Sequence, residues 1–352
     1  MRMKMNVRAT TITRGVAALA IGAAAGFLFS ALKTPIPWML GPLFSIALLR
    51  VCGVSVAAPN GSRQIGQWII GTALGLYFTP PVIEQVARLW PLLLLGAAFA
   101  ILVGYVAGIA LARLGGLDRT TAIFASVPGG AAEMATLGER FGARVDRVAA
   151  AQSMRILIVV TVIPTLYAAL QWHGADPYVP GTTTFAPTGF AELIGFTLVG
   201  GFIARAIDVP NPFVLGALAV AIPLTALKLD LSAVPQLASN AAQCLLGCAL
   251  GSRFEADFLR GAHRFVGAVV TTVLLSMLLS AGFGLVVAWA TGLSAATLVL
   301  GTAPGGVAEM SITAKVLQLG VPLVTALHVT RVVVLLLVTA PLFAWIRAQR
   351  GR

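Results

Sequence analysis

The sequence predicts an all-α polytopic membrane protein built from two homologous repeats. Three observations support this fold class: the composition, the recurrence of apolar stretches and a match of the chain with itself. Of the 352 residues, 58% are hydrophobic and 10% are charged, whereas about 25% of the residues of a soluble domain are charged. The apolar runs are continuous, which indicates helices, because a membrane β-barrel shows short alternating segments of about 10 residues.

About ten membrane-spanning helices are expected from these apolar runs. They cover residues 14–32, 35–51, 65–77, 90–111 and 156–170, and then 193–207, 212–227, 241–250, 265–290 and 321–346. The first run, which follows a basic start, also fits a cleaved signal peptide. We interpret it as a membrane span because its counterpart recurs inside the chain.

The chain matches itself at a shift of 176 positions. Gln67, Gly71 and Gly75 fall on Gln243, Gly247 and Gly251 without a gap, and Arg155 falls on Arg331. Nearer the start of each copy the shift is 175, which pairs Pro35 with Pro210. A shared apolar composition would not align glutamine and arginine, so the match indicates a duplication. We expect a cytoplasmic segment at 1–13, repeats at 14–172 and 188–346, a linker at 173–187 and a basic cytoplasmic tail at 347–352.

The distribution of arginine and lysine predicts that the repeats are inverted. If residues 120–138 and 296–314 each enter the membrane and return on the same side, each copy has five spans. Most basic residues then lie inside with both termini, and only Lys33, Arg88, Lys228 and Lys315 lie outside. If both segments cross, the basic residues divide almost evenly, so the positive-inside rule favours re-entrant segments. An odd number of spans inverts the second copy, as in many secondary transporters; six crossing spans per copy are the alternative.

Two related motifs interrupt the apolar stretches, PGGAAEM at 128–134 and PGGVAEM at 304–310. Proline and paired glycines destabilise a helix, so each segment should break and expose backbone groups that need protein or a water-lined cavity around them. A half-helix that starts near the glycines suits an anion, and carbonyls at a broken end suit a cation. The candidate substrate or ion ligands here are Pro128, Gly129, Gly130, Pro304, Gly305 and Gly306.

Four ionisable residues complete this set of binding candidates: Glu133, Glu309, Arg155 and Arg331. Charged groups at membrane depth are unfavourable by about 2.5 to 3.5 kcal/mol, so they are retained mostly for a site or for a pairing. One interpretation is an ion pair between each glutamate and an arginine that clamps the fold. The other is a substrate or proton site, in which free arginines favour an anion and a protonated glutamate carries a coupling proton. Both can hold at once.

A second tier of polar candidates comprises Gln152, His328, Gln67 and Gln243. Gln152 precedes Arg155 by three residues and His328 precedes Arg331 likewise, so each pair shares a helix face. Gln67 and Gln243 are followed by glycines at four-residue spacing. That spacing more often means close helix packing with one interhelical hydrogen bond than a ligand site.

The sequence favours no cofactor, no metal and no enzymatic activity. Its histidines, His173, His263 and His328, are scattered, and Cys52, Cys244 and Cys248 show neither a zinc spacing nor a paired framework. The net charge of +12 comes from basic residues spread between the spans. We therefore expect no direct nucleic-acid binding.

The twin motifs inside two apolar repeats resemble the AbrB family of bacterial inner-membrane proteins, over nearly the whole chain. The resemblance implies a multi-pass protein of the bacterial inner membrane. Family members carry labels as regulators of gene expression or as ammonia monooxygenases. A copper or iron monooxygenase needs clustered ligands that this sequence lacks, and a DNA-binding regulator needs an exposed basic module that no connection here is long enough to form.

The expected function is that of a secondary transporter or permease for a small solute, with an organic anion as one candidate, bound at the two motifs. The alternative is a membrane sensor that acts indirectly on gene expression. The expected partners are the lipid bilayer and a small molecule or ion, and a homo-oligomer is left open.

Overall fold

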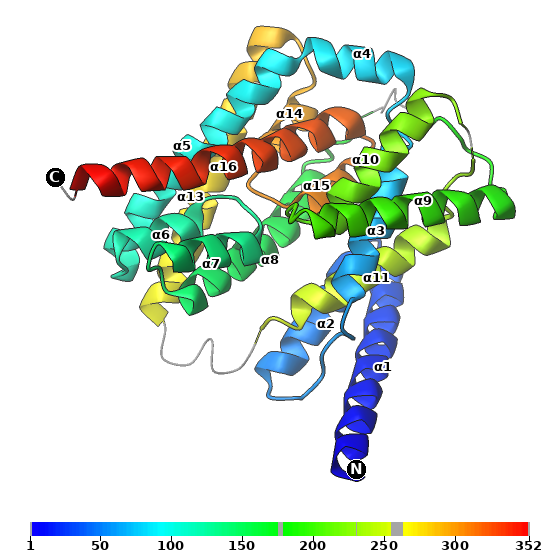
Figure 1. The fold of residues 1–352 in the computed structure, drawn as a ribbon, viewed down its shortest axis with the longest axis horizontal. Coiled ribbons are helices and arrows are strands. Elements are labelled where there is room, and N and C mark those ends of the chain that lie inside the picture. The colour runs from blue at the N-terminus through cyan, green and yellow to red at the C-terminus, as the bar shows by residue number, and fades with distance from the viewer. Residues whose placement is uncertain (1, 175–178, 230, 255–262, 351–352) are drawn as a thin grey trace. The chain divides into compact units, whose positions relative to one another are not determined.

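The computed structural model describes residues 2–174, 179–229, 231–254 and 263–350 (Figure 1). Within these ranges the chain forms helices and no strand, so the predicted all-α polytopic fold class is confirmed. Five helices are long and apolar enough to cross a membrane: Thr13–Ala31, Trp90–Gly115, Val145–Ala169, Pro187–Ala206 and His263–Thr291. Shorter apolar helices cover Pro37–Val51, Pro212–Ala226 and Val321–Leu335. Linker residues 175–178, Arg260 and tail residues 351–352 lie outside the described residues.

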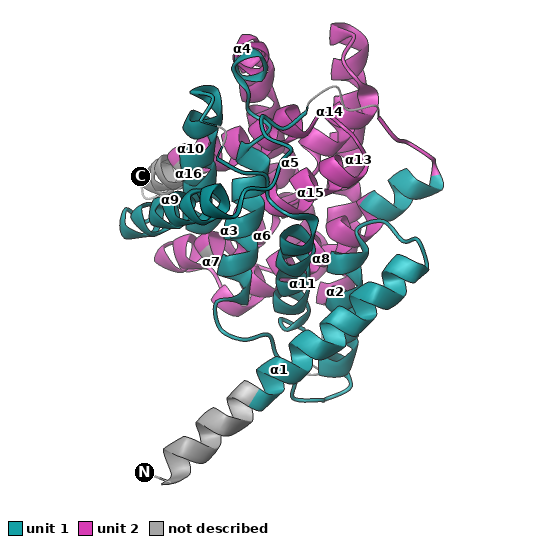
Figure 2. Cartoon of the chain, turned by 90° about the vertical axis from the view of Figure 1, so that its right-hand side faces the viewer, with its two compact units in different colours: residues 1–83, 164–169, 178–261 teal, residues 84–163, 170–177, 262–352 magenta. Residues whose placement is uncertain are grey.

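The first of two compact units contains residues 1–83, 164–169 and 178–261 (Figure 2). Its helices are α1 (Arg2–Ala31), α2 (Pro37–Val51), α3 (Ser62–Gly75), α9 (Pro187–Ala206), α10 (Pro212–Ala226) and α11 (Gln236–Gly251). Helix α2 packs against α1 and α11, and α10 packs against α3 and α9. Helices from the two halves of the sequence are therefore interleaved within this unit.

Glycines bring the helices of this unit close together. A Cβ atom on Gly71 of α3 would lie 2.7 Å from the Val214 carbonyl oxygen of α10, and one on Gly247 of α11 would collide with the Met39 carbonyl of α2. These two contacts involve matched positions of the two copies, because the shifts of 176 and 175 relate their members. Small residues at such positions let membrane helices approach each other closely.

The second compact unit contains residues 84–163, 170–177 and 262–352 (Figure 2). Its helices are α5 (Trp90–Gly115), α6 (Arg119–Ser126), α7 (Ala131–Arg140), most of α8 (Val145–Ala169), α13 (His263–Thr291), α14 (Ala295–Thr302), α15 (Val307–Val316) and α16 (Val321–Arg350). Helix α5 packs against α6, α13 and α16, and α16 also packs against α14 and α15. Both interrupted segments, α6–α7 and α14–α15, thus belong to one unit.

Two helices differ most from the sequence-based expectation. The short helix α4 (Pro80–Arg88) was not expected, because it is amphipathic and forms no long apolar run. Helix α8 begins at Val145 rather than at residue 156. Its first turns carry polar residues, so the apolar run covers only the later part of the helix.

The local conformation of the interrupted segments repeats at the shift of 176. The side chain of Asp118 accepts a hydrogen bond from the Thr121 amide at the start of α6, and Ser294 accepts one from the Thr297 amide at the start of α14. Helices α5 and α13 both end in a glycine in the left-handed region, with φ 66° at Gly116 and 71° at Gly292. A residue with a side chain rarely adopts this conformation.

Candidate functional site

Both motifs break their helix where the sequence predicts. Helix α6 ends at Ser126 and α7 begins at Ala131, and the matched pair α14 and α15 is interrupted over residues 303–306. Val127 is extended at φ −60° and ψ 128°, as expected for a residue that precedes a proline. Gly130 and Gly306 are extended N-cap residues of the second half-helices.

Each motif glycine faces the side chain of another motif residue. A Cβ atom on Gly129 would lie 2.7 Å from Met134 Cγ, and one on Gly130 would collide with the Glu133 carboxylate. The second copy repeats both contacts at the matched positions, between Gly305 and Met310 and between Gly306 and Glu309. The spacing of glycine, glutamate and methionine in the motif therefore reflects a tight local fit, in which a Cβ at either glycine would displace the methionine or glutamate side chain.

The motif glutamates lie at the starts of the second half-helices. Glu133 and Glu309 are each the third residue after the N-cap glycine and are acidic residues of the first turn. A carboxylate at this position is favoured by the amide dipoles of the helix start. Glu309 is only 4% exposed, whereas Glu133 is partly buried.

The buried arginines bind main-chain carbonyls of the broken segments. Arg155 donates from Nη1 to the Val127 carbonyl at 3.1 Å and from Nη2 to the Gly129 carbonyl at 3.0 Å. Arg331 donates in the same way to the carbonyls of Ala303, at 2.7 Å, and Gly305. Each guanidinium therefore spans the break and supplies donors to carbonyls that have left the helix.

Gln152 and His328 add a second contact to each break. Gln152 Nε2 donates to the carbonyls of Phe124, at 2.8 Å, and Val127, at 2.9 Å. His328 Nε2 lies 3.2 Å from the Leu300 carbonyl, which it binds as a donor in the tautomer that carries the proton on Nε2. These contacts supply donors to carbonyls near the interruption that the helix no longer satisfies.

The charges of the two copies influence one another within the second unit. Arg155 on α8 lies within electrostatic range of the Glu309 carboxylate of α15 and of Arg331 on α16. All three side chains come from different helices, and each is at least nine-tenths buried. The structure thus brings Arg155, Arg331 and Glu309 together from both copies.

The other second-tier residues belong to the first unit. Gln67 Nε2 donates to Asn211 Oδ1 at 3.2 Å, which is an interhelical hydrogen bond of the kind that its spacing predicts. Gln243 is buried on α11. Among the described residues, no group of three or more His, Cys, Asp or Glu side chains is arranged to hold a metal ion.

The carbonyls that the arginines bind were not identified from the sequence. In both copies the arginine follows its two carbonyl partners by 28 and 26 residues. The duplication makes this spacing equal in the two copies. Because every residue carries a backbone carbonyl, however, the sequence does not show which carbonyls the arginines bind. Only the folded chain distinguishes the acceptors.

The helices and the two interrupted segments define a polytopic helical membrane protein. The chain belongs to the AbrB family, whose model, described as "Transition state regulatory protein AbrB", matches residues 38–347. It is similar to "Uncharacterized protein YhjN" of Bacillus subtilis (strain 168), with 29% identity over 365 residues that cover 95% of this chain and 93% of that protein. It is also similar to "Putative regulator AbrB" of Escherichia coli (strain K12), with 23% identity over 318 residues, 90% of this chain and 91% of that protein. The resemblance carried by the two motifs is thereby confirmed.

Proposed function

We propose that this protein is a secondary transporter or permease for a small organic anion, which binds at the two interrupted segments. The observation that carries the proposal is the repeated arrangement in the second unit. There, each broken helix is held by a buried arginine, and charges from both copies lie within reach of one another.

The chemistry of the segments favours an anion. Amide groups at the starts of α7 and α15 and the guanidiniums of Arg155 and Arg331 attract negative charge. The two glutamates balance the two arginines as long as both are ionised. Because the glutamates offset the arginines, removal of either carboxylate should change how strongly an anion is bound.

The proposal includes a cellular setting. We place the protein in the bacterial inner membrane with both termini in the cytoplasm, with repeats at 14–172 and 188–346 in inverted orientation. It acts on a solute without chemical conversion and without direct contact with nucleic acid. In secondary transporters with inverted repeats, interrupted helices commonly line the binding site near the middle of the membrane.

Reconstitution into liposomes tests the transport activity. Metabolite levels of wild-type and deletion strains first select the accumulated or depleted carboxylates, and their uptake is then measured under proton and sodium gradients. We expect uptake by the wild-type protein and its loss in Glu133→Gln and Glu309→Gln. The matched control is Glu84→Gln, which changes an exposed glutamate of α4 and should retain uptake. Absence of uptake of every selected solute by the wild-type protein, under either gradient, would argue against a transporter.

A membrane sensor is the second candidate, because the family description and one relative carry the word regulator or regulatory. A sensor would bind a small effector at the same segments and alter gene expression indirectly. In that case Glu133→Gln and Glu309→Gln would leave solute uptake unchanged in cells and would change transcript levels. Transcript profiling beside the uptake assay separates the two functions.

A further inference from the structure

A cluster of arginines lies where helices of the second unit end and begin. Arg264, in the first turn of α13, donates from Nε to the Leu114 carbonyl near the end of α5, at 2.8 Å. The Arg147 guanidinium, near the start of α8, lies 4.9 Å from the centre of the Phe265 ring of α13. We call Arg144, Arg147 and Arg264 the arginine cluster; it joins the ends of three helices.

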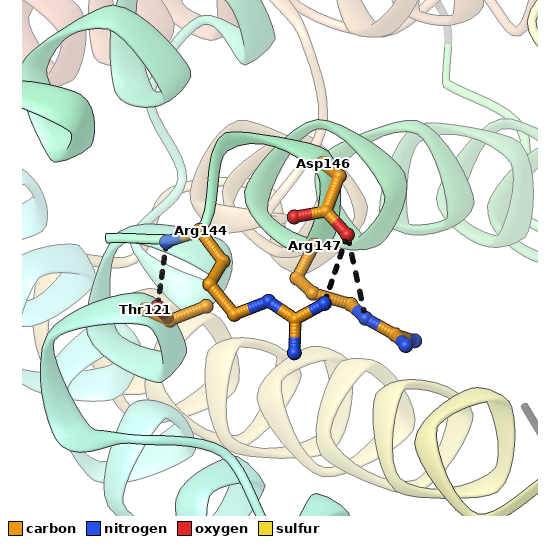
Figure 3. Close-up of polar contacts among 4 residues, drawn as sticks. All are labelled: Thr121, Arg144, Asp146 and Arg147. Atoms are coloured by element: carbon orange, nitrogen blue, oxygen red, sulfur yellow. Dashed lines mark hydrogen bonds and ion pairs between the residues drawn. The ribbon is translucent and has the colours of Figure 1, made fainter. Parts of the chain in front are cut away.

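One carboxylate serves two members of this cluster (Figure 3). Asp146 Oδ2 lies 3.2 Å from Arg144 Nη2 and 3.6 Å from Arg147 Nε. The hydrogen bond of Arg264 goes to a neutral carbonyl. Two guanidiniums therefore share one carboxylate, Arg264 has no acidic partner among the ion pairs of the described residues, and the four side chains carry a formal net charge of 3 − 1 = +2.

The arginine cluster combines exposed charge with exposed apolar surface. The side chains of Arg144 and Arg147 are 57% and 30% exposed, and Leu114 and Val145 beside them are 48% and 38% exposed. Helices α5 and α13 are long and apolar enough to span a bilayer, so their ends lie at the level of the lipid headgroups. A guanidinium binds phosphate oxygens in a bidentate manner, and apolar side chains at that depth contact acyl chains.

The second copy provides a natural comparison, because it keeps the backbone contact without the charges. The Arg144 amide donates to Thr121 Oγ1 at 2.9 Å (Figure 3), and the matched Gly320 amide donates to Thr297 Oγ1 at 3.3 Å. At the shift of 176, Gly320, Pro322 and Leu323 stand in place of Arg144, Asp146 and Arg147. The fold at this corner therefore does not require the charged side chains.

We propose that the arginine cluster binds the phosphate of an anionic phospholipid, with Leu114 and Val145 against its acyl chains. The positive-inside rule by itself requires basic residues on this side. It does not require Arg144 and Arg147 to share one carboxylate, with Arg147 over the Phe265 ring next to Arg264 and an exposed apolar surface beside them. The proposal is independent of the transport activity.

Lipid binding to the full-length purified protein tests the proposal. Native mass spectrometry measures the bound fraction of phosphatidylglycerol and of phosphatidylcholine with identical acyl chains. We expect the wild-type protein to prefer phosphatidylglycerol, and Arg144→Gln and Arg147→Gln each to weaken its binding about fivefold, the effect of one basic residue near a headgroup. Asp146→Asn should strengthen binding, because it releases two guanidiniums from their shared carboxylate.

The control is Arg88→Gln, which removes one exposed charge from α4, outside the cluster. It should leave phosphatidylglycerol binding unchanged. Only variants whose melting temperature matches that of the wild-type protein are compared, so that a loss of binding does not reflect unfolding. Equal binding of the two lipids by the wild-type protein would overturn the proposal, as would equal losses in Arg88→Gln and Arg147→Gln. Full competition by soluble glycerol phosphate would also overturn it, since the ligand would then be a free anion rather than a lipid.

Discussion

The two interrupted segments of the second unit share their backbone contacts and differ in how they are enclosed. In both copies an arginine binds the same two matched carbonyls. In the first copy Gly129 and Glu133 are partly buried, whereas in the second Gly305 and Glu309 are buried. The shared contacts satisfy the carbonyls that the interruption releases from the helix. The first segment is therefore more accessible than the second.

Substitution of the two buried arginines tests the hydrogen bonds that both segments share. These variants should have the largest effects on stability. Arg155→Leu and Arg331→Leu each remove two charged hydrogen bonds and leave buried carbonyls without donors. We expect each to lower the free energy of unfolding by about 3 kcal/mol or more. Denaturant titration of the purified protein in detergent micelles measures the loss, with Arg88→Leu as the control. A harmless Arg155→Leu would mean that the first segment does not need its arginine.

Substitution of the N-cap glycines of α7 and α15 tests whether the two segments differ in how deeply their glutamates are buried. A Cβ at either N-cap glycine collides with a carboxylate, and overpacking of this kind is unfavourable by about 1 to 3 kcal/mol. We expect the larger loss of unfolding free energy for Gly306→Ala, because the buried Glu309 cannot move away as readily as Glu133. Gly195→Ala is the control, since a Cβ there meets nothing within 4 Å.

A double variant sharpens this comparison further. Glu309→Ala removes the side chain that a Cβ at Gly306 would strike, so adding Gly306→Ala to it should have less effect than Gly306→Ala alone. Additive losses in the same denaturant titration would show that another contact explains the requirement for glycine.

Variants of Gln152 and of its counterpart His328 in the second copy should give the smallest effects. Gln152→Leu removes hydrogen bonds to two carbonyls and His328→Leu removes one. We expect losses of about 2 and about 1 kcal/mol, at about 1 kcal/mol for each bond. His328→Gln should preserve stability, because the first copy holds the matched carbonyl with glutamine. If His328→Gln lowers the melting temperature strongly, His328 makes a stabilising contact that Gln152 does not make in the first copy.

The sequence was sufficient to predict the fold class, the helix breaks at residues 128–130 and 304–306, and the family. Apolar length, proline and paired glycines act locally, so their effects are readable without coordinates. The acceptors of Arg155 and Arg331 depend on how α8 and α16 dock against the breaks, which is a tertiary property. Helix α4 was missed because nine amphipathic residues give no span-length signal. The inversion of the repeats rests on charge distribution and remains a prediction.

The glutamate that covers each N-cap glycine has a consequence for binding strength. An anion that approaches the start of α7 or α15 meets a carboxylate already tethered there by the chain. Such an internal competitor acts at an effective concentration in the millimolar range or above. This tethered carboxylate would weaken the affinity of the site for an anion and speed the release of the anion. The protein would then work at high solute concentrations, with no change in the arginines.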